Sequence, residues 1–217
     1  ESPWGRIYLA PTEEHEATAS EATPEWRPQV ELHGKCRVNV SNYGFDTFGD
    51  LFTSRQLVAL TTFSDLVQTA IVRCQQDAVS AGVPDDDLPL EAGGRGARAY
   101  AEAVGVYLSF ALDKVTDSCS SLCAWQSKMD RLRSTFGRQA LPMSWDFVEA
   151  NPFSDSSGSL RSALKSICGA LSGRGYRQLM GSVETRQIVA EANVGLHGQV
   201  VISTDPPYYD NVPYSDL

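Results

Sequence analysis

The chain lacks a run of about 20 consecutive apolar residues, the length that a membrane-spanning helix needs. Its start also lacks a basic head followed by an apolar stretch, so we expect no secretory signal peptide. Both absences predict a protein that does not act at a membrane. The first residue is Glu1, which indicates a piece of a longer protein.

A disulfide framework is not indicated either, because the five cysteines are odd in number and widely scattered. Such usage favours the reducing environment of the cytoplasm over a secreted scaffold. Cys119 and Cys123 have the spacing C-x3-C, but no second pair and no nearby histidine completes a zinc site. We therefore expect structural thiols and no bound metal.

Positive charge is scarce: 18 Lys and Arg residues face 27 Asp and Glu residues, for a net charge of −9. Affinity for a phosphate backbone comes mainly from Lys and Arg, so such a chain is a poor stand-alone nucleic-acid binder. One segment departs from this balance by carrying four basic residues against one acid, Asp130: Lys128, Arg131, Arg133 and Arg138. This surplus predicts a DNA phosphate contact. A solvated face paired with nearby acids is an equally good interpretation.

The apolar spacing predicts three helices. Thr53 and Gln56 form a capping-box pattern at the start of the first, and Gly82 and Pro84 end it. The second spans residues 97–117 and is expected to pack antiparallel to the first. The third, with the stripe Leu160 to Leu171, follows an Asn-Pro turn and ends at a glycine.

The length of 217 residues fits one large domain or two small ones. We expect an irregular arm over residues 1–40, in which alternating Cys36, Val38 and Val40 predict a short strand. Residues 41–175 form a helical region, and 176–217 contain the best strand, Gln199 to Thr204. The predicted fold is α/β and predominantly helical.

The strongest functional signal is Asp205 to Tyr208, directly after that strand. The amino group of a nucleobase is a poor nucleophile, because its lone pair is delocalised into the ring. The Asp205 carboxylate and the Pro206 carbonyl can accept the two amino hydrogens, in a loop that Pro206 and Pro207 stiffen by fixing φ. The Tyr208 ring can stack on a base swung out of a duplex. The alternative is a proline turn that merely closes a strand, with Asp205 solvated.

The segment Asp205 to Leu217 resembles the motif region of large prokaryotic adenine-specific DNA methylases, which carry an N-terminal domain of unknown function. Three upstream segments are also similar to that family: Gly49 to Leu57, Ser120 to Trp125, and Thr135 to Phe147 with its continuation Asn151 to Phe153. The resemblance covers the chain from about residue 40 to its end.

The resemblance implies a methyltransferase with a Rossmann-like sheet and S-adenosylmethionine as methyl donor. The motif Asp205, Pro206, Pro207 and Tyr208 would then be catalytic. Polar and aromatic neighbours would bind the substrate: Tyr209, Asp210 and Tyr214. The glycine-rich donor loop would lie before Glu1 and further strands after Leu217, so we expect this piece to be inactive alone.

Two alternatives remain open. Similar motifs serve methylation of RNA bases and of protein glutamine side chains, so the acceptor is not decided. The helical region could also be a non-catalytic recognition or interaction module. Three aromatic residues near the basic segment are expected to pack in the core rather than to stack on bases: Trp125, Trp145 and Phe147.

Overall fold

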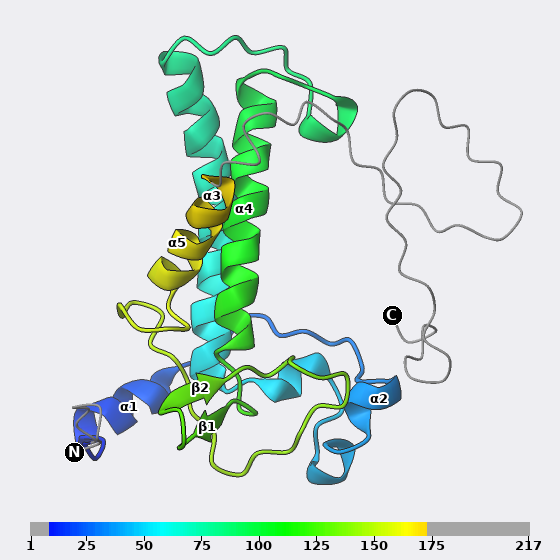
Figure 1. Ribbon diagram of the computed structural model, residues 1–217, viewed down its shortest axis with the longest axis vertical. Coiled ribbons are helices and arrows are strands. Elements are labelled where there is room, and N and C mark those ends of the chain that lie inside the picture. The colour runs from blue at the N-terminus through cyan, green and yellow to red at the C-terminus, as the bar shows by residue number, and fades with distance from the viewer. Residues whose placement is uncertain (1–8, 173–217) are drawn as a thin grey trace, which may run out of the picture. The chain divides into compact units, whose positions relative to one another are not determined.

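The computed structural model describes residues 9–172, and all structural statements below concern this range. The chain divides into two units, residues 1–171 and 172–217. The described part is mostly helical with one two-stranded antiparallel sheet, which confirms the α/β, predominantly helical class (Figure 1). The α-helices and strands are α1 (Glu13–Glu21), α2 (Gly34–Arg37), α3 (Ser54–Ser80), α4 (Ala97–Asp117), β1 (Ala124–Gln126), β2 (Arg131–Arg133) and α5 (Leu160–Leu171). Three short 3-10 helices are η1 (Ser41–Tyr43), η2 (Phe48–Leu51) and η3 (Leu90–Ala92).

Helix α3 begins at the predicted capping box. The Thr53 hydroxyl accepts a hydrogen bond from the Gln56 N–H at 3.4 Å, and Gln56 Oε1 accepts one from the Thr53 N–H at 2.9 Å. The pair satisfies two N–H groups that the helix start would otherwise leave without partners. The helix ends before Gly82, whose φ of +86° lies in the left-handed region that favours glycine. The predicted helix and both of its ends are confirmed.

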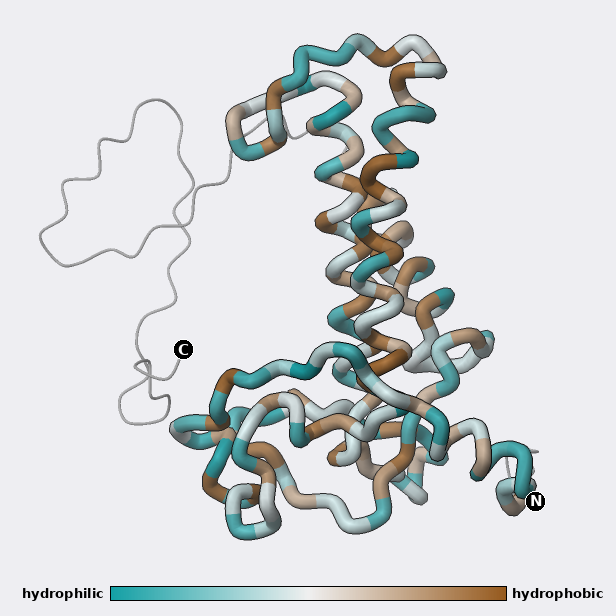
Figure 2. The backbone as a smooth tube through the Cα atoms, turned by 180° about the vertical axis from the view of Figure 1, so that it is seen from behind, coloured by the Kyte–Doolittle hydropathy of each residue, from teal (hydrophilic) through white to brown (hydrophobic). Residues whose placement is uncertain are grey.

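Helices α3 and α4 lie side by side and antiparallel, as predicted (Figures 1 and 2). The buried residues Ala97, Ala101 and Gly105 recur every four positions, so they form one face of α4. A Cβ atom at Gly105 would lie 2.5 Å from Cδ1 of Ile71, which shows how closely the two helices approach there. Small residues on α4 thus allow the apolar face of α3 to pack directly against the backbone of α4.

Helix α5 packs against α4 near the base of this helical pair. Ala163 is buried against Ala111 and Val115 of α4, and the partly buried side chains of Leu60, Leu160, Leu164 and Ile167 surround this cluster. The Lys114 ammonium group donates a hydrogen bond to the Ser166 hydroxyl at 3.1 Å. The predicted stripe is therefore confirmed for Leu160, Leu164 and Ile167, but Cys168 and Leu171 at its end are exposed.

A second core lies below the helices and collects side chains from distant segments. Its buried members are Leu32, Val40, Leu51, Leu122 and Leu141. The strand predicted over Cys36 to Val40 is wrong, because this segment contains the single turn α2 and the residues that follow it. Val40 is buried but Val38 is 64% exposed, so the alternating residues do not share a face. With no neighbouring strand to pair with, this segment satisfies its backbone by local turns.

By length and composition alone, α3 is apolar enough to cross a membrane. The chain still has no run of about 20 consecutive apolar residues, and hydropathy is here averaged along the helix rather than counted over an unbroken run. Over residues 57–74 of this helix only Asp65 and Arg73 are charged, and the Leu, Val, Ile and Phe residues outweigh them in the mean hydropathy. Thr, Ser and Gln residues interrupt the apolar ones, so no long run of consecutive apolar residues forms.

Candidate functional site

The expected methylation site lies outside the described residues, as does the strand expected over Gln199 to Thr204. Its seven members are Asp205, Pro206, Pro207, Tyr208, Tyr209, Asp210 and Tyr214. The four basic residues predicted to contact DNA do lie in the described part of the chain. They are the predicted site residues that the structure places.

These basic residues lie on and beside a short β-hairpin. Strands β1 and β2 pair antiparallel, with Lys128 in the connecting turn and Arg138 in the loop after β2. The turn ends at Asp130, whose φ of +48° is in the left-handed region that Asp tolerates better than most residues. Each strand has only three residues, too few for the alternation by which a strand is recognised in a sequence.

Arg131 and Arg133 line the same cavity, which has a volume of about 430 Å³. Alternate residues of a strand point to the same face, which explains why these two come together. Arg131 Nε donates a hydrogen bond at 2.9 Å to Oε1 of Gln126, its partner across the hairpin. The remaining lining is mostly small and polar: Ser118, Leu132, Ser134, Gly137, Ser157 and Gly158. No carboxylate is among these lining residues, so the cavity is positively charged.

Lys128 and Arg138 are not among the residues that line this cavity, so the structure gathers only part of the predicted basic set. None of the four basic side chains forms an ion pair with another residue of the range 9–172. The alternative interpretation was a solvated face whose basic side chains pair with nearby acids. Within residues 9–172 no such ion pair is formed by these four side chains. Arginines that line a cavity and have no carboxylate partner within residues 9–172 favour an anionic ligand.

A buried network ties the hairpin to the end of α4. The Thr135 N–H donates to the Asp117 carbonyl at 2.9 Å, and the Thr135 and Ser120 hydroxyls are 2.7 Å apart. The Phe136 N–H donates to the Asp117 carboxylate at 2.8 Å. Ser120 and Thr135 are almost fully buried, so losing either partner would leave a polar group without water or protein contact. The network thereby fixes the chain just after Arg133.

The turn at Ser157 and Gly158 also lines the cavity. Gly158 has a φ of +86°, and a Cβ atom there would lie 2.7 Å from Cβ of Ala150. The Ala150 N–H in turn donates to the carbonyl of Ser118, another lining residue, at 3.2 Å. A residue larger than glycine at this position would therefore have to displace Ala150 or the turn itself.

Glu149 connects the segment before this turn to the start of α3. Its Oε1 accepts a hydrogen bond from Arg55 Nε at 2.8 Å, and its Oε2 accepts one from Nε2 of Gln56. The Arg55 guanidinium also lies 5.8 Å from the centroid of the Phe147 ring. A carboxylate near a helix N-terminus is stabilised by the helix dipole. These contacts hold residues 147–149 against α3.

The two cysteines with C-x3-C spacing are buried beside this region. Burial, together with repulsion from the Glu149 carboxylate, raises the pKa of the Cys119 thiol to about 11. The Cys119 thiol donates a weak hydrogen bond to the Ala150 carbonyl at 3.4 Å. A protonated, buried thiol is neither a nucleophile nor a metal ligand near neutral pH. Cys119 therefore has a packing role.

The expectation that the nearby aromatic residues pack in the core is wrong for Trp145, which is 74% exposed. Its ring meets that of Tyr43 edge-on, with the centroids 5.0 Å apart. Trp125 on β1 is also exposed, while Phe147 is partly buried. An aromatic residue in a loop has no periodic neighbours that would indicate its side in advance.

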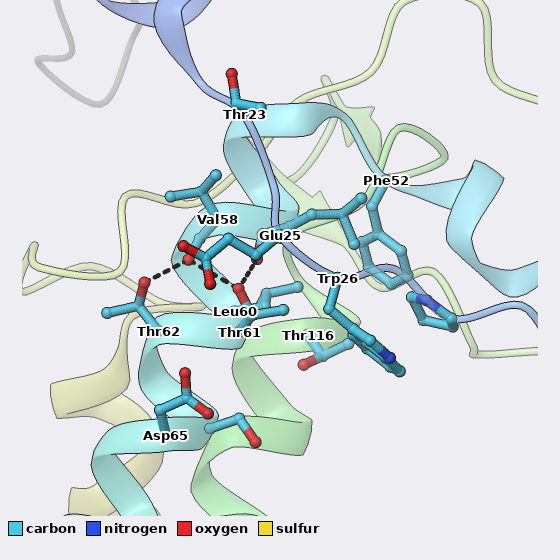
Figure 3. Close-up of a pocket in the computed structure, with 13 residues that line it drawn as sticks. Thr23, Glu25, Trp26, Phe52, Val58, Leu60, Thr61, Thr62, Asp65 and Thr116 are labelled. Carbon is cyan, nitrogen blue, oxygen red and sulfur yellow. Dashed lines mark hydrogen bonds between the residues drawn. The ribbon is translucent and has the colours of Figure 1, made fainter.

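Sequence reasoning missed a second cavity, a groove of about 650 Å³ between residues 23–28 and the first turns of α3. Figure 3 shows Glu25 and Trp26 from the arm and Asp65 from α3 around it. An acid next to a tryptophan, with Pro24 and Pro28 on either side, was the available signal. By itself this segment has no hydrophobic periodicity and so predicts only an irregular connection.

No protein-family model, no curated protein and no solved structure matches this chain. A function can therefore be argued only from its own residues.

Proposed function

We propose that this chain belongs to a DNA methyltransferase that methylates the exocyclic amino group of adenine. The observation that carries the proposal is the sequence Asp205 to Tyr208 at the end of the apolar run Val200 to Thr204. An acid, two prolines and an aromatic ring supply two fixed acceptors for amino hydrogens and one stacking surface. A Rossmann-like sheet that includes residues 176–217, and a place in the cytoplasm, belong to the same proposal.

The methyl group would come from S-adenosylmethionine, which supplies an electrophilic carbon. Within residues 9–172 the only strands are β1 and β2, and neither leads into a glycine-rich turn followed by a helix. The described residues therefore do not fit a donor site of that kind. The part of this chain in the proposed reaction is to hold the acceptor base and the DNA.

For the acceptor base, Asp205 and the Pro206 carbonyl would orient the amino group with its lone pair toward the methyl carbon. Tyr208 would stack on the flipped base, and Tyr209, Asp210 and Tyr214 would border it. The proton lost from the nitrogen would leave through Asp205 or to water after methyl transfer. Preorganised acceptors of this type act mainly by positioning and electrostatics.

For the DNA, the cavity lined by Arg131 and Arg133 would bind a backbone phosphate. What supports this role is the absence of carboxylates among its lining residues and the absence of ion pairs on the arginines within residues 9–172. Phosphate contacts position a duplex without reading its sequence. Lys128 and Arg138 would extend the same basic surface without lining the cavity.

The test is the Asp205→Ala variant of the whole protein, assayed with labelled S-adenosylmethionine. We expect label in the adenine of DNA for the wild type and none for the variant. Asp146→Ala, which removes an exposed acid near the basic segment, serves as the matched control and should keep full activity. Undiminished labelling by Asp205→Ala would remove the catalytic assignment. Label in RNA or in protein glutamine instead of DNA would show that the methyl acceptor is not adenine in DNA.

A further inference from the structure

The groove between the N-terminal arm and α3 has a firmly held wall. The Arg27 guanidinium pairs with the Asp50 carboxylate at 2.8 Å, and the Gly49 N–H donates to the Pro28 carbonyl at 3.1 Å. A Cβ atom at Gly49 would lie 2.5 Å from that carbonyl oxygen, so the arm follows the backbone at van der Waals distance. Trp26 directly precedes these anchors in the chain, and its side chain is 62% exposed.

Asp50 is the centre of this attachment. Its carboxylate accepts hydrogen bonds from the Thr47 N–H at 2.7 Å and the Thr47 hydroxyl at 2.8 Å. Burial opposes its ionisation, but these hydrogen bonds and the Arg27 charge keep the pKa of Asp50 below its ordinary value. The carboxylate is therefore charged at neutral pH, and the arm stays attached.

The groove is acidic. Of the residues that line it, only Glu25 and Asp65 are ionisable, and both are carboxylic acids. Neither side chain forms an ion pair or a hydrogen bond with another residue in the described part of the chain. Figure 3 shows both on the side of α3 that faces the groove, with the Asp65 carboxylate pointing toward the part where Glu25 lies.

The other polar groups of the groove add few donors. The Thr61 and Thr62 hydroxyls donate to the α3 carbonyls of Leu57 and Val58 at 2.8 and 2.7 Å, respectively. They present oxygen lone pairs to the groove, as the two carboxylates do. A ligand that fits must therefore supply hydrogen-bond donors and positive charge.

The remaining lining is apolar and aromatic. Phe52 and Leu57 contribute apolar surface beside the exposed ring of Trp26. The ring offers a flat apolar surface against which the methylene stem of an arginine can pack while its guanidinium donates to carboxylates. Two carboxylates are too few ligands for a calcium ion, which takes six to eight oxygens.

We propose that this groove binds an arginine side chain of a basic polypeptide, with the guanidinium between Glu25 and Asp65 and its stem against Trp26. The charge of the groove and the net charge of −9 both favour a basic partner. The volume of about 650 Å³ is within the range of ligand sites and leaves room for residues beside the arginine. The site is separate from the arginine-lined cavity and does not depend on the methyltransferase proposal.

The test uses two blocked pentapeptides, one with a central arginine and one with citrulline, the neutral isostere. Binding is followed through the indole N–H resonance of Trp26 in the 217-residue chain, assigned by its loss in Trp26→Phe. We expect a saturable shift with the arginine peptide and at least about tenfold weaker binding of the citrulline peptide. Equal binding of both peptides, or no saturable shift at millimolar concentration, would overturn the proposal.

The second arm of the experiment uses the double variant Glu25→Gln/Asp65→Asn. Its affinity for the arginine peptide should be lower by about tenfold or more. Glu91→Gln is the control, because it removes an exposed acid in η3, at the other end of the paired helices. Thermal unfolding checks that all variants are folded. Spermidine binding as tightly as the arginine peptide would indicate a polyamine site and would contradict the proposal.

Discussion

The side-chain amide of Gln56 donates a hydrogen bond to the carboxylate of Glu149, which lies 93 positions later in the chain. Gln56 is 2% exposed, and its carbonyl oxygen accepts from the Thr53 N–H. One side chain thus completes the cap of α3 and also fixes the segment that leads to the wall of the arginine-lined cavity. Buried polar groups in such a network are costly to leave unpaired.

Gln56→Glu should separate these two roles. A glutamate can still complete the capping box, but it would place a second carboxylate against Glu149. We expect the free energy of unfolding to fall by about 1–3 kcal/mol, measured by urea denaturation. The double variant Gln56→Glu/Glu149→Gln re-forms the hydrogen bond with donor and acceptor exchanged, so most of the loss should be recovered. No recovery would show that the contact with Glu149 is not the cause.

Gly105→Leu should weaken the packing of α3 on α4. A Cβ atom at this position already meets Ile71 at 2.5 Å, so a leucine would force the helices apart. We expect a loss of about 1–3 kcal/mol in the free energy of unfolding, as overpacked sites show. Gly169→Leu is the control, since a Cβ atom there has open space within the helix α5. Equal effects of the two substitutions would contradict the close approach at Gly105.

The double variant Arg131→Ala/Arg133→Ala should reduce the DNA affinity of the whole protein, and by the same factor for every DNA sequence. Loss of two phosphate contacts should lower the slope of log affinity against log salt by about 2, measured by fluorescence anisotropy with a labelled duplex. The control is Arg73→Ala/Arg95→Ala, which removes the same charge from α3 and from the loop before α4. If both double variants change the slope equally, net charge rather than the cavity determines binding.

The buried thiol of Cys119 should make stability sensitive to alkaline pH. Burial, with the Glu149 charge second, raises its pKa from 9.0 to about 11. The folded state therefore favours the neutral thiol, and this contribution is complete below pH 9.0 and is lost as the pH rises through about 11. Over this window the wild type should lose free energy of unfolding more steeply than Cys119→Ala, measured by urea denaturation at each pH.

Cys168→Ala supplies the comparison for this measurement, because Cys168 is exposed. Its pH dependence should match that of the wild type. Parallel curves for Cys119→Ala and the wild type would instead show that the thiol ionises as easily in the folded protein as in the unfolded chain.

The three long helices could be predicted from the sequence because their signals are local. The capping box at Thr53 and Gln56, the stop at Gly82 and the stripe from Leu160 to Leu171 each involve residues within a few turns of one another. The same kind of reasoning failed for Cys36 to Val40. Three alternating residues indicate a strand only if a partner strand exists, and none pairs with them in the described part.

The sequence by itself determined the helical character, the excess of negative charge and the local basic surplus around Arg131. Only the tertiary structure decided that Arg131 and Arg133 meet Ser157 in one cavity, that Gln56 meets Glu149, and that Trp26 meets Asp65 in a groove. The reason is physical. Helix signals come from contacts three or four residues apart, whereas these sites join residues tens of positions apart, and their meeting depends on how all the packed surfaces fit together.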